Sequence, residues 1–318
     1  MEFVVKKTTE LTKVEQKGIL SLFNDIFHEH RTQEEFLNQY LNNVLGFSYH
    51  SIILDNGAIV GASAFVPSYY IVKGERSLFT VSIDTMIRKS HRGIENFYDL
   101  IYNAFKIMKE EGVAFVIGFP NDASHPIFTA INLMLDIGRL DTFCLPLRIG
   151  GIKDKLRPLN IFSNLFCRSW LYVSTLFATD KLFSLPIHRD FETFNQTRYK
   201  RMDGDYCQVN LPGLEFFYKL KTIEGIRTAT LIDVTQKSER NFCRAAQYIV
   251  QHEKKNFDSL LFVGHLPFKN IGMIKVPKRF EPKTIYFNGI MLNQDALDIE
   301  TISKLGNWDV NLADFDLI

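Results

Sequence analysis

The segment Val81-Ser-Ile-Asp-Thr-Met-Ile87 has the composition of a β-strand, and the basic loop Arg88-Lys-Ser-His-Arg-Gly93 follows it directly. Residues 94–109 then repeat apolar side chains at helical spacing, namely Phe97, Ile101, Phe105 and Met108. Residues 113–119 (VAFVIGF) form a continuous apolar run bounded by glycine and proline, which is typical of a buried strand. Together these pieces predict a strand–helix–strand core.

The rest of the N-terminal half extends this core. Helices are predicted over 14–28 and after Thr32, where Thr32-Gln-Glu-Glu35 is close to a capping box. Three strand-like runs, which predict an antiparallel meander, lie at 51–54, 58–72 and 78–87. A helix over 126–135 and a strand over 137–147 complete the predicted order α-α-β-β-β-α-β-α-β.

The C-terminal half shows a second version of the same order. Strands are predicted at 215–222, 227–234, 258–264 and 284–292, and an amphipathic helix at 238–253. Between the halves, residues 161–183 are rich in Phe and Leu and predict a helix, which either packs between the halves or lies on a membrane surface. We therefore predict an α+β protein with an internal duplication, in which each half is a mixed, mostly antiparallel sheet flanked by helices. The predicted ranges are 1–150, a helical linker at 151–190, and 191–318.

Composition excludes several classes of protein. With 37 Lys and Arg against 36 Asp and Glu, the net charge of +1 gives no case for nucleic-acid binding. The four cysteines lie far apart and lack metal-ligand spacing, so we expect neither a metal site nor a disulfide framework. The N-terminus lacks a signal-peptide core, and the least polar stretch, 159–178, contains Asn and Arg, so no transmembrane segment is expected and a cytoplasmic location is the default. Phe is abundant, at 28 residues, and most of these fall at core-facing positions.

Several short motifs occur in a suggestive order. Ile83-Asp-Thr85 ends the first strand, His91-Arg-Gly93 opens the helix, and Gly118-Phe-Pro-Asn-Asp-Ala-Ser124 follows the buried strand. With the tail Gly306-Asn-Trp308 and Asp314-Phe-Asp316, this order resembles the GNAT family of acyl-CoA N-acyltransferases. More narrowly, it resembles the tandem-GNAT proteins associated with bacterial surface-polysaccharide biosynthesis. The resemblance implies acyl transfer from acetyl-CoA to a small-molecule amine or an amino sugar.

The resemblance also implies roles for particular residues. Asp84 would be the base that deprotonates the attacking amine, with Asn121 and Ser124 near the thioester and pantetheine. The backbone around Met86 and Ile87 would hold the thioester. The pyrophosphate of the coenzyme would lie on the turn Arg92, Gly93, Ile94, Glu95 and Asn96, at a helix N-terminus.

Each of these residues also has a purely structural interpretation. Asp84 could bind a turn N–H, Asn121 could close a turn, Ser124 could cap the next helix, and Arg92 could be a solvated loop residue.

Two residues depart from the family pattern. Glu95 and Phe97 stand where the GNAT phosphate loop has glycine or another small residue, which weighs against coenzyme binding. Two negative charges about 4 Å apart repel by roughly 1–4 kcal/mol near a protein surface. The alternative is a degenerate GNAT scaffold that binds a glycan precursor or a protein partner. Separately, the basic, aromatic cluster within 188–201 could hold a phosphorylated sugar carrier or an acidic glycan, or be a solvated face. Aminoacyl transfer from tRNA is a third possibility, which the charge does not support. The acceptor, the acyl length and the oligomeric state stay open.

Overall fold

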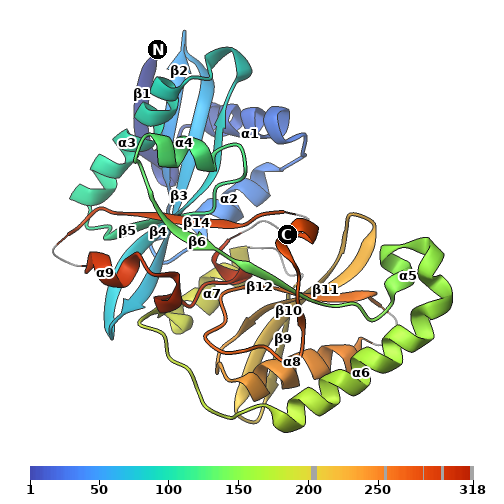
Figure 1. Ribbon diagram of the computed structural model, residues 1–318. Coiled ribbons are helices and arrows are strands. Elements are labelled where there is room, and N and C mark those ends of the chain that lie inside the picture. Colours follow the sequence, from blue (N-terminus) through green and yellow to red (C-terminus); the bar gives the residue numbers. More distant parts are fainter. Residues whose placement is uncertain (202–205, 254–255, 282, 295–296, 316–318) are drawn as a thin grey trace. The chain divides into compact units, whose positions relative to one another are not determined.

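The computed structural model describes residues 1–318 apart from 202–205, 254–255, 282, 295–296 and 316–318 (Figure 1). The chain forms two compact units, each with its own sheet and helices. Unit 1 comprises Met1–Arg139, Pro186–Gly204 and Ile285–Asn307, and unit 2 comprises Leu140–Leu185, Asp205–Thr284 and Trp308–Ile318. Both sheets are mixed and mostly antiparallel, so the predicted α+β class with two such halves is confirmed.

The two units are interleaved along the chain, unlike the continuous ranges 1–150, 151–190 and 191–318. Strand β14 (Tyr286–Met291) lies late in the sequence but pairs with β5 (Phe115–Gly118) in unit 1. Strand β7 (Asp141–Leu145) lies early but pairs with β12 (Ser259–Gly264) in unit 2. One physical reason explains both pairings. The buried strands β5 and β12 each need a partner on both edges to satisfy their backbone hydrogen bonds.

The sheet of unit 1 has the order β1-β2-β3-β4-β5-β14-β6, and β8 pairs with β3. Its further strands are β1 (Glu2–Lys7), β2 (Tyr49–Asp55), β3 (Ala58–Val72), β4 (Glu75–Ile87), β6 (Leu135–Arg139) and β8 (Ile187–Arg189). The predicted antiparallel meander is confirmed by β2, β3 and β4. Among the strands that the structure describes in this sheet, β4 and β5 are the one parallel pair. Neither β1 nor β8 was predicted, because both are short and polar for strands.

Helices cover both faces of this sheet. They are α1 (Lys13–Phe27), α2 (Gln33–Leu41), α3 (Ile94–Glu110), α4 (His125–Ala130), α7 (Phe191–Arg201) and α9 (Ile299–Ile302), with short 3-10 turns η1 (Thr8–Glu10), η2 (Lys89–His91) and η5 (Leu305–Asn307). The predicted cap is confirmed, since the Thr32 hydroxyl accepts from the Glu35 N–H and Glu35 accepts from the Thr32 N–H. Helix α3 packs on one face, whereas α1 and α2 pack on the other. Helix α4 ends five residues before the predicted 135, where β6 begins.

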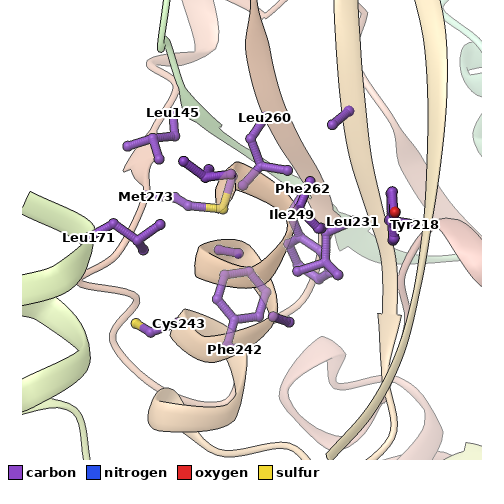
Figure 2. Close-up of a cluster of buried hydrophobic side chains, with 14 of the residues drawn as sticks. Leu145, Leu171, Tyr218, Leu231, Phe242, Cys243, Ile249, Leu260, Phe262 and Met273 are labelled. Atoms are coloured by element: carbon purple, nitrogen blue, oxygen red, sulfur yellow. The ribbon is translucent and has the colours of Figure 1, made fainter. Parts of the chain in front are cut away.

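The sheet of unit 2 has the order β13-β7-β12-β11-β10-β9. Its further strands are β9 (Tyr206–Leu211), β10 (Leu214–Ile223), β11 (Ile226–Val234) and β13 (Ile274–Lys275). Its helices are α5 (Ile149–Ile152), α6 (Asn160–Phe177) and α8 (Glu239–His252), with turns η3 (Asp154–Leu159), η4 (Lys278–Phe280) and η6 (Leu312–Asp314). Figure 2 shows its core, where Phe242 and Ile249 of α8 meet Leu231 and Phe262 of the sheet.

Helix α6 ends at Phe177 rather than at the predicted 183. Its inner side packs on unit 2, through Leu171 in the core and through hydrogen bonds from Arg168 Nη2 to the Val250 carbonyl and from Ser174 Oγ to the Ile271 carbonyl. This helix is therefore a part of unit 2. In the portion of the chain that the structure describes, no helix is both long enough and apolar enough to cross a membrane.

Candidate functional site

Strands β4 and β5 separate at one end of the parallel pair. Their paired register ends at Ser82 and Gly118, after which β5 stops while β4 continues to Ile87. Beyond Ser82, β4 is paired with β3 alone among the described residues. The backbone N–H and C=O groups on the other edge of β4 can therefore meet a ligand.

Asp84 lies two residues beyond this separation. The register of β4 against β3 is irregular here, and Asp84 has a φ of 51°. Aspartate tolerates this left-handed conformation better than most residues. Its side chain, which is 17% exposed, accepts two hydrogen bonds at Oδ2, from Arg31 Nη1 at 2.7 Å and from the Tyr40 hydroxyl at 2.5 Å. Both bonds use Oδ2, and no hydrogen bond among the described residues reaches Oδ1, which an incoming group could use.

Arg31 and Tyr40 hold Asp84 in place, and neither was predicted. Burial raises the pKa of Tyr40 well above its ordinary value, and the Asp84 carboxylate raises it further. Tyr40 is therefore a neutral phenol that donates. The Arg31 guanidinium lies 3.6 Å from the centre of the Phe23 ring, which fixes its position. The apolar repeat at Phe36 and Tyr40 placed Tyr40 on the inner face of its helix, but it could not show a partner 44 residues away.

The loop after β4 lines a cavity of about 720 Å³. Three cationic side chains of this loop, Arg88, Lys89 and Arg92, face residues of α1 there, among them Asp25. Gly93 precedes α3 without a capping side chain, so no side chain covers the first N–H groups of this 17-residue helix. Cations beside an uncovered helix N-terminus form a suitable site for an anion.

The structure places the other predicted coenzyme residues around this turn. Met86 and Ile87 have buried side chains, so they can meet a ligand only through their backbones. Arg92 Nε donates to the Ile87 carbonyl at 3.1 Å, and Asn96 Nδ2 donates to the His91 carbonyl at 2.7 Å. These two bonds fold the loop onto the end of β4.

The residues in the first turn of α3 point in different directions. Gly93, Ile94 and Glu95 are exposed. Phe97 is only 9% exposed and packs edge-on against Phe128, with ring centroids 5.0 Å apart. The predicted core-facing position of Phe97 is therefore confirmed, and its side chain points away from the loop. Glu95 remains as the departure that opposes an anion.

Asn121 and Ser124 bind mainly each other. Asn121 Oδ1 accepts from the N–H groups of Ala123 at 3.0 Å and Ser124 at 2.9 Å, and the Ser124 hydroxyl is 3.1 Å from it. The predicted turn closure by Asn121 is therefore present. Ser124 precedes α4, but its side chain makes no capping bond, so that interpretation is wrong. No described hydrogen bond connects either residue to Asp84.

Two of the cationic side chains in the basic cluster within 188–201 lie in the interior. Arg189 is fully buried and Arg198 is 3% exposed. The side chains of Lys200 and Arg201 lie outside the described residues, as does Asp316 in the C-terminal motif.

Unit 2 contains a counterpart of the Asp84 site. Its parallel pair ends at Leu231 and Phe262, and Asp233 lies two residues further on, again next to a register shift. Here, however, Asn311 from the C-terminal segment pairs with Gly264 and donates from Nδ2 to Asp233 Oδ1 at 2.8 Å. Lys237 binds Asp309 and lies 3.7 Å from Asp233. The corresponding place in unit 2 is thus occupied by the chain itself.

Comparison with known proteins bears on the family and the fold. Residues 7–130 match the family model of the acetyltransferase (GNAT) domain. A conserved Enterococcus faecalis protein of unknown function has 12% identity and a TM-score of 0.59, covering 92% of this chain and 73% of that one. A GCN5-related N-acetyltransferase from Anabaena variabilis has 12% identity and a TM-score of 0.57, covering 91% and 73%.

A third structure has a similar fold. Saccharomyces cerevisiae N-myristoyltransferase with bound myristoyl-CoA has 9% identity and a TM-score of 0.53, covering 92% of this chain and 79% of that one. No curated protein matches the sequence. Residues 7–130 thus match an acetyltransferase (GNAT) domain, and the chain shares the fold of these structures.

Proposed function

We propose that this protein transfers an acyl group from acyl-CoA to the amine of a small acceptor, at the end of β4 in unit 1. The observation that carries the proposal is the edge of β4 beyond Ser82, which pairs with no other described strand. Asp84 and the uncapped start of α3 lie on the same strand and the loop that follows it. A pantetheine arm can add to such an edge as a strand would, through backbone hydrogen bonds.

The coenzyme phosphates would bind the loop after β4. Arg88, Lys89 and Arg92 supply positive charge, and the first turn of α3 supplies N–H groups. Glu95 in that turn opposes them, which predicts weaker binding than a glycine would allow. Since Phe97 points away, the loop backbone is still open to the phosphates.

Asp84 would act on the acceptor. The amine nitrogen forms a bond to the thioester carbonyl carbon, the carbon–sulfur bond breaks, and the coenzyme leaves as a thiolate. Oδ1 of Asp84 takes the proton that the amine loses, and this proton then passes to the thiolate, so that the thiol is released. Arg31 and Tyr40 keep the carboxylate oriented through Oδ2. The resemblance to polysaccharide-biosynthesis proteins makes an amino sugar the first acceptor to test, in a cytoplasmic enzyme.

Thermal unfolding with acetyl-CoA tests the coenzyme site. A ligand at about 100 times its dissociation constant stabilises a protein by roughly 2.7 kcal/mol, so we expect a clear rise in Tm. Acetyl-pantetheine, which lacks the phosphates, is the matched control and should give a much smaller rise. If millimolar acetyl-CoA leaves Tm unchanged, the acyltransferase proposal is wrong and a degenerate scaffold takes its place.

A further inference from the structure

Helix α6 presents an apolar face to solvent. Its exposed positions are Ile161, Phe162, Leu165, Phe166, Ser169, Trp170, Tyr172, Val173, Leu176 and Phe177. Ser169 is the one polar side chain among them, and none is charged. Phe162 is 71% exposed and Phe177 is 78% exposed. A solvated helix face normally carries Lys and Glu, so this one is built to contact something apolar.

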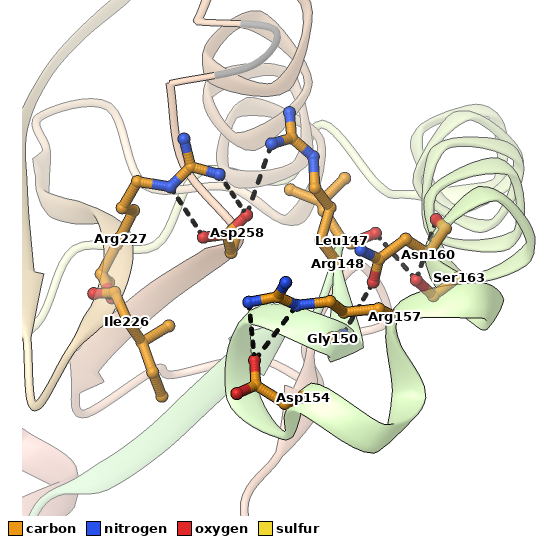
Figure 3. A network of polar contacts seen from close by, with 11 residues as sticks. Leu147, Arg148, Gly150, Asp154, Arg157, Asn160, Ser163, Ile226, Arg227 and Asp258 are labelled. Atoms are coloured by element: carbon orange, nitrogen blue, oxygen red, sulfur yellow. Dashed lines mark hydrogen bonds and ion pairs between the residues drawn. The ribbon is translucent and has the colours of Figure 1, made fainter.

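The opposite side of α6 fixes that face in place. Leu171 is buried in the core shown in Figure 2. Figure 3 shows the start of the helix, where Asn160 Oδ1 accepts from the Gly150 N–H at 2.7 Å and Ser163 Oγ donates to the Leu147 carbonyl at 2.9 Å. Trp170 Nε1 donates to the Ile271 carbonyl at 2.9 Å, so its polar atom is satisfied within the protein.

We infer that the exposed face of α6 binds the surface of a membrane containing anionic lipids. A helix of 18 residues is about 27 Å long, and lying flat it would place its aromatic and aliphatic side chains among the lipid headgroups and upper acyl chains. Phe and Leu supply the buried area, and Trp170 and Tyr172 belong to the residue types enriched at that depth.

The charges beside the helix complement an anionic surface. Helix α6 itself has no acidic residue. Asp154 pairs with Arg157 in the preceding turn, and Asp180 pairs with Arg240. Exposed lysines also flank the helix, namely Lys153, Lys155 and Lys181. A lysine near an anionic bilayer contributes attraction that has no counterpart at a neutral one.

A second copy of the chain is less suited to this face. A two-fold contact of α6 with α6 would bring the flanking lysines of both copies close together. The face offers no acidic side chain to offset their repulsion, whereas anionic lipid headgroups do.

Vesicle flotation of the full chain tests the inference. We expect binding to vesicles of phosphatidylcholine with phosphatidylglycerol, and much weaker binding to phosphatidylcholine alone. Phe162→Glu should lower the bound fraction about tenfold or more, because it removes apolar contact and adds a charge. Phe280→Glu is the matched control, since Phe280 in η4 is 64% exposed but lies outside α6, and it should bind like the wild type.

A second variant tests the charges. Lys153→Gln combined with Lys155→Gln should reduce binding to phosphatidylglycerol vesicles by about fivefold per lysine, with no change at phosphatidylcholine. Failure of the wild type to float overturns the inference. So does a wild-type dimer that Phe162→Glu converts to a monomer while flotation is unaffected, because the face would then be a contact between copies. Equal loss of flotation in Phe280→Glu and Phe162→Glu overturns it as well.

Discussion

Asp84 in unit 1 and Asp233 in unit 2 occupy the same place in two versions of one arrangement. Each follows an isoleucine, lies two residues beyond the last parallel pair, and is next to a register shift. Asp84 is 17% exposed and is held by Arg31 and Tyr40 at one oxygen. Asp233 is fully buried, with Asn311 and Lys237 around it. The same strand end is open in one unit and filled in the other.

The two units therefore share a fold, but they differ at the strand end where unit 1 has its candidate site. Both units have two antiparallel strands, a helix and a parallel strand in sequence, as expected from a duplication. In unit 2 the C-terminal segment bridges Gly264, and the His265 N–H donates to the Val310 carbonyl. A ligand could enter there only by displacing paired backbone. We therefore expect unit 1 to carry the activity and unit 2 to contribute stability.

The largest effect should come from exchanging one aspartate for asparagine. Asp84→Asn removes the proposed base while keeping the shape, so acyl transfer should fall by roughly 10²–10⁴-fold. Asp233→Asn is the matched control, and it should retain the wild-type rate per folded molecule. The measurement is acetyl-CoA turnover with an amine acceptor. Similar losses in both variants would contradict the assignment of the two units.

The buried ion network of unit 2 should show the next largest effect, on stability. Lys237→Ala removes the buried cation that binds Asp309 and lies beside Asp233, and breaking a buried ion pair on one side typically costs about 3–5 kcal/mol. Arg31→Ala breaks a partly exposed pair in unit 1 and should cost about 1 kcal/mol or less. Urea unfolding measures the free energy of unfolding of both variants and of the wild type. A larger loss in Arg31→Ala would show that the unit 1 carboxylate is the structural one.

Two glycines at the ends of the parallel strands allow a finer test. A Cβ at Gly264 would lie 2.7 Å from Asn311 Cβ and 2.9 Å from the Val310 oxygen, so Gly264→Ala must push the C-terminal segment away. We expect a loss of about 1–3 kcal/mol. A Cβ added at Gly118 would lie 3.0 Å from the sulfur of the flexible Met134 side chain, which can move. Gly118→Ala should therefore lower the free energy of unfolding less than Gly264→Ala. Equal losses in thermal unfolding would show that the segment does not fill the strand end.

The sequence placed Asp84 near the end of a strand, but it gave no sign of the segment that covers Asp233 in unit 2. The position of Asp84 followed from local patterns, because a strand, a basic loop and an amphipathic helix are each encoded by neighbours in sequence. Tyr40 and Asn311 depend on contacts across 44 and 78 residues, which no periodicity records. The inward direction of Phe97 followed from the helical face that it shares with Ile101 and Phe105, whereas the family pattern shows only the residue type at that position.

The smallest expected effect concerns the glutamates that open the two equivalent helices. Glu95 in α3 lies beside the proposed phosphate site, and Glu95→Gln should tighten acetyl-CoA binding up to about tenfold by removing repulsion. The same change removes a favourable charge from the helix N-terminus, so stability should fall by about 0.3–1 kcal/mol. Glu239→Gln in α8 is the control, because Glu239 already binds Thr179 and should not affect the coenzyme. Calorimetric titration measures the affinity of both variants for acetyl-CoA. A glutamate with a purely structural role would lower stability on substitution and leave the affinity unchanged, so an unchanged affinity in Glu95→Gln would place the phosphates away from the start of α3.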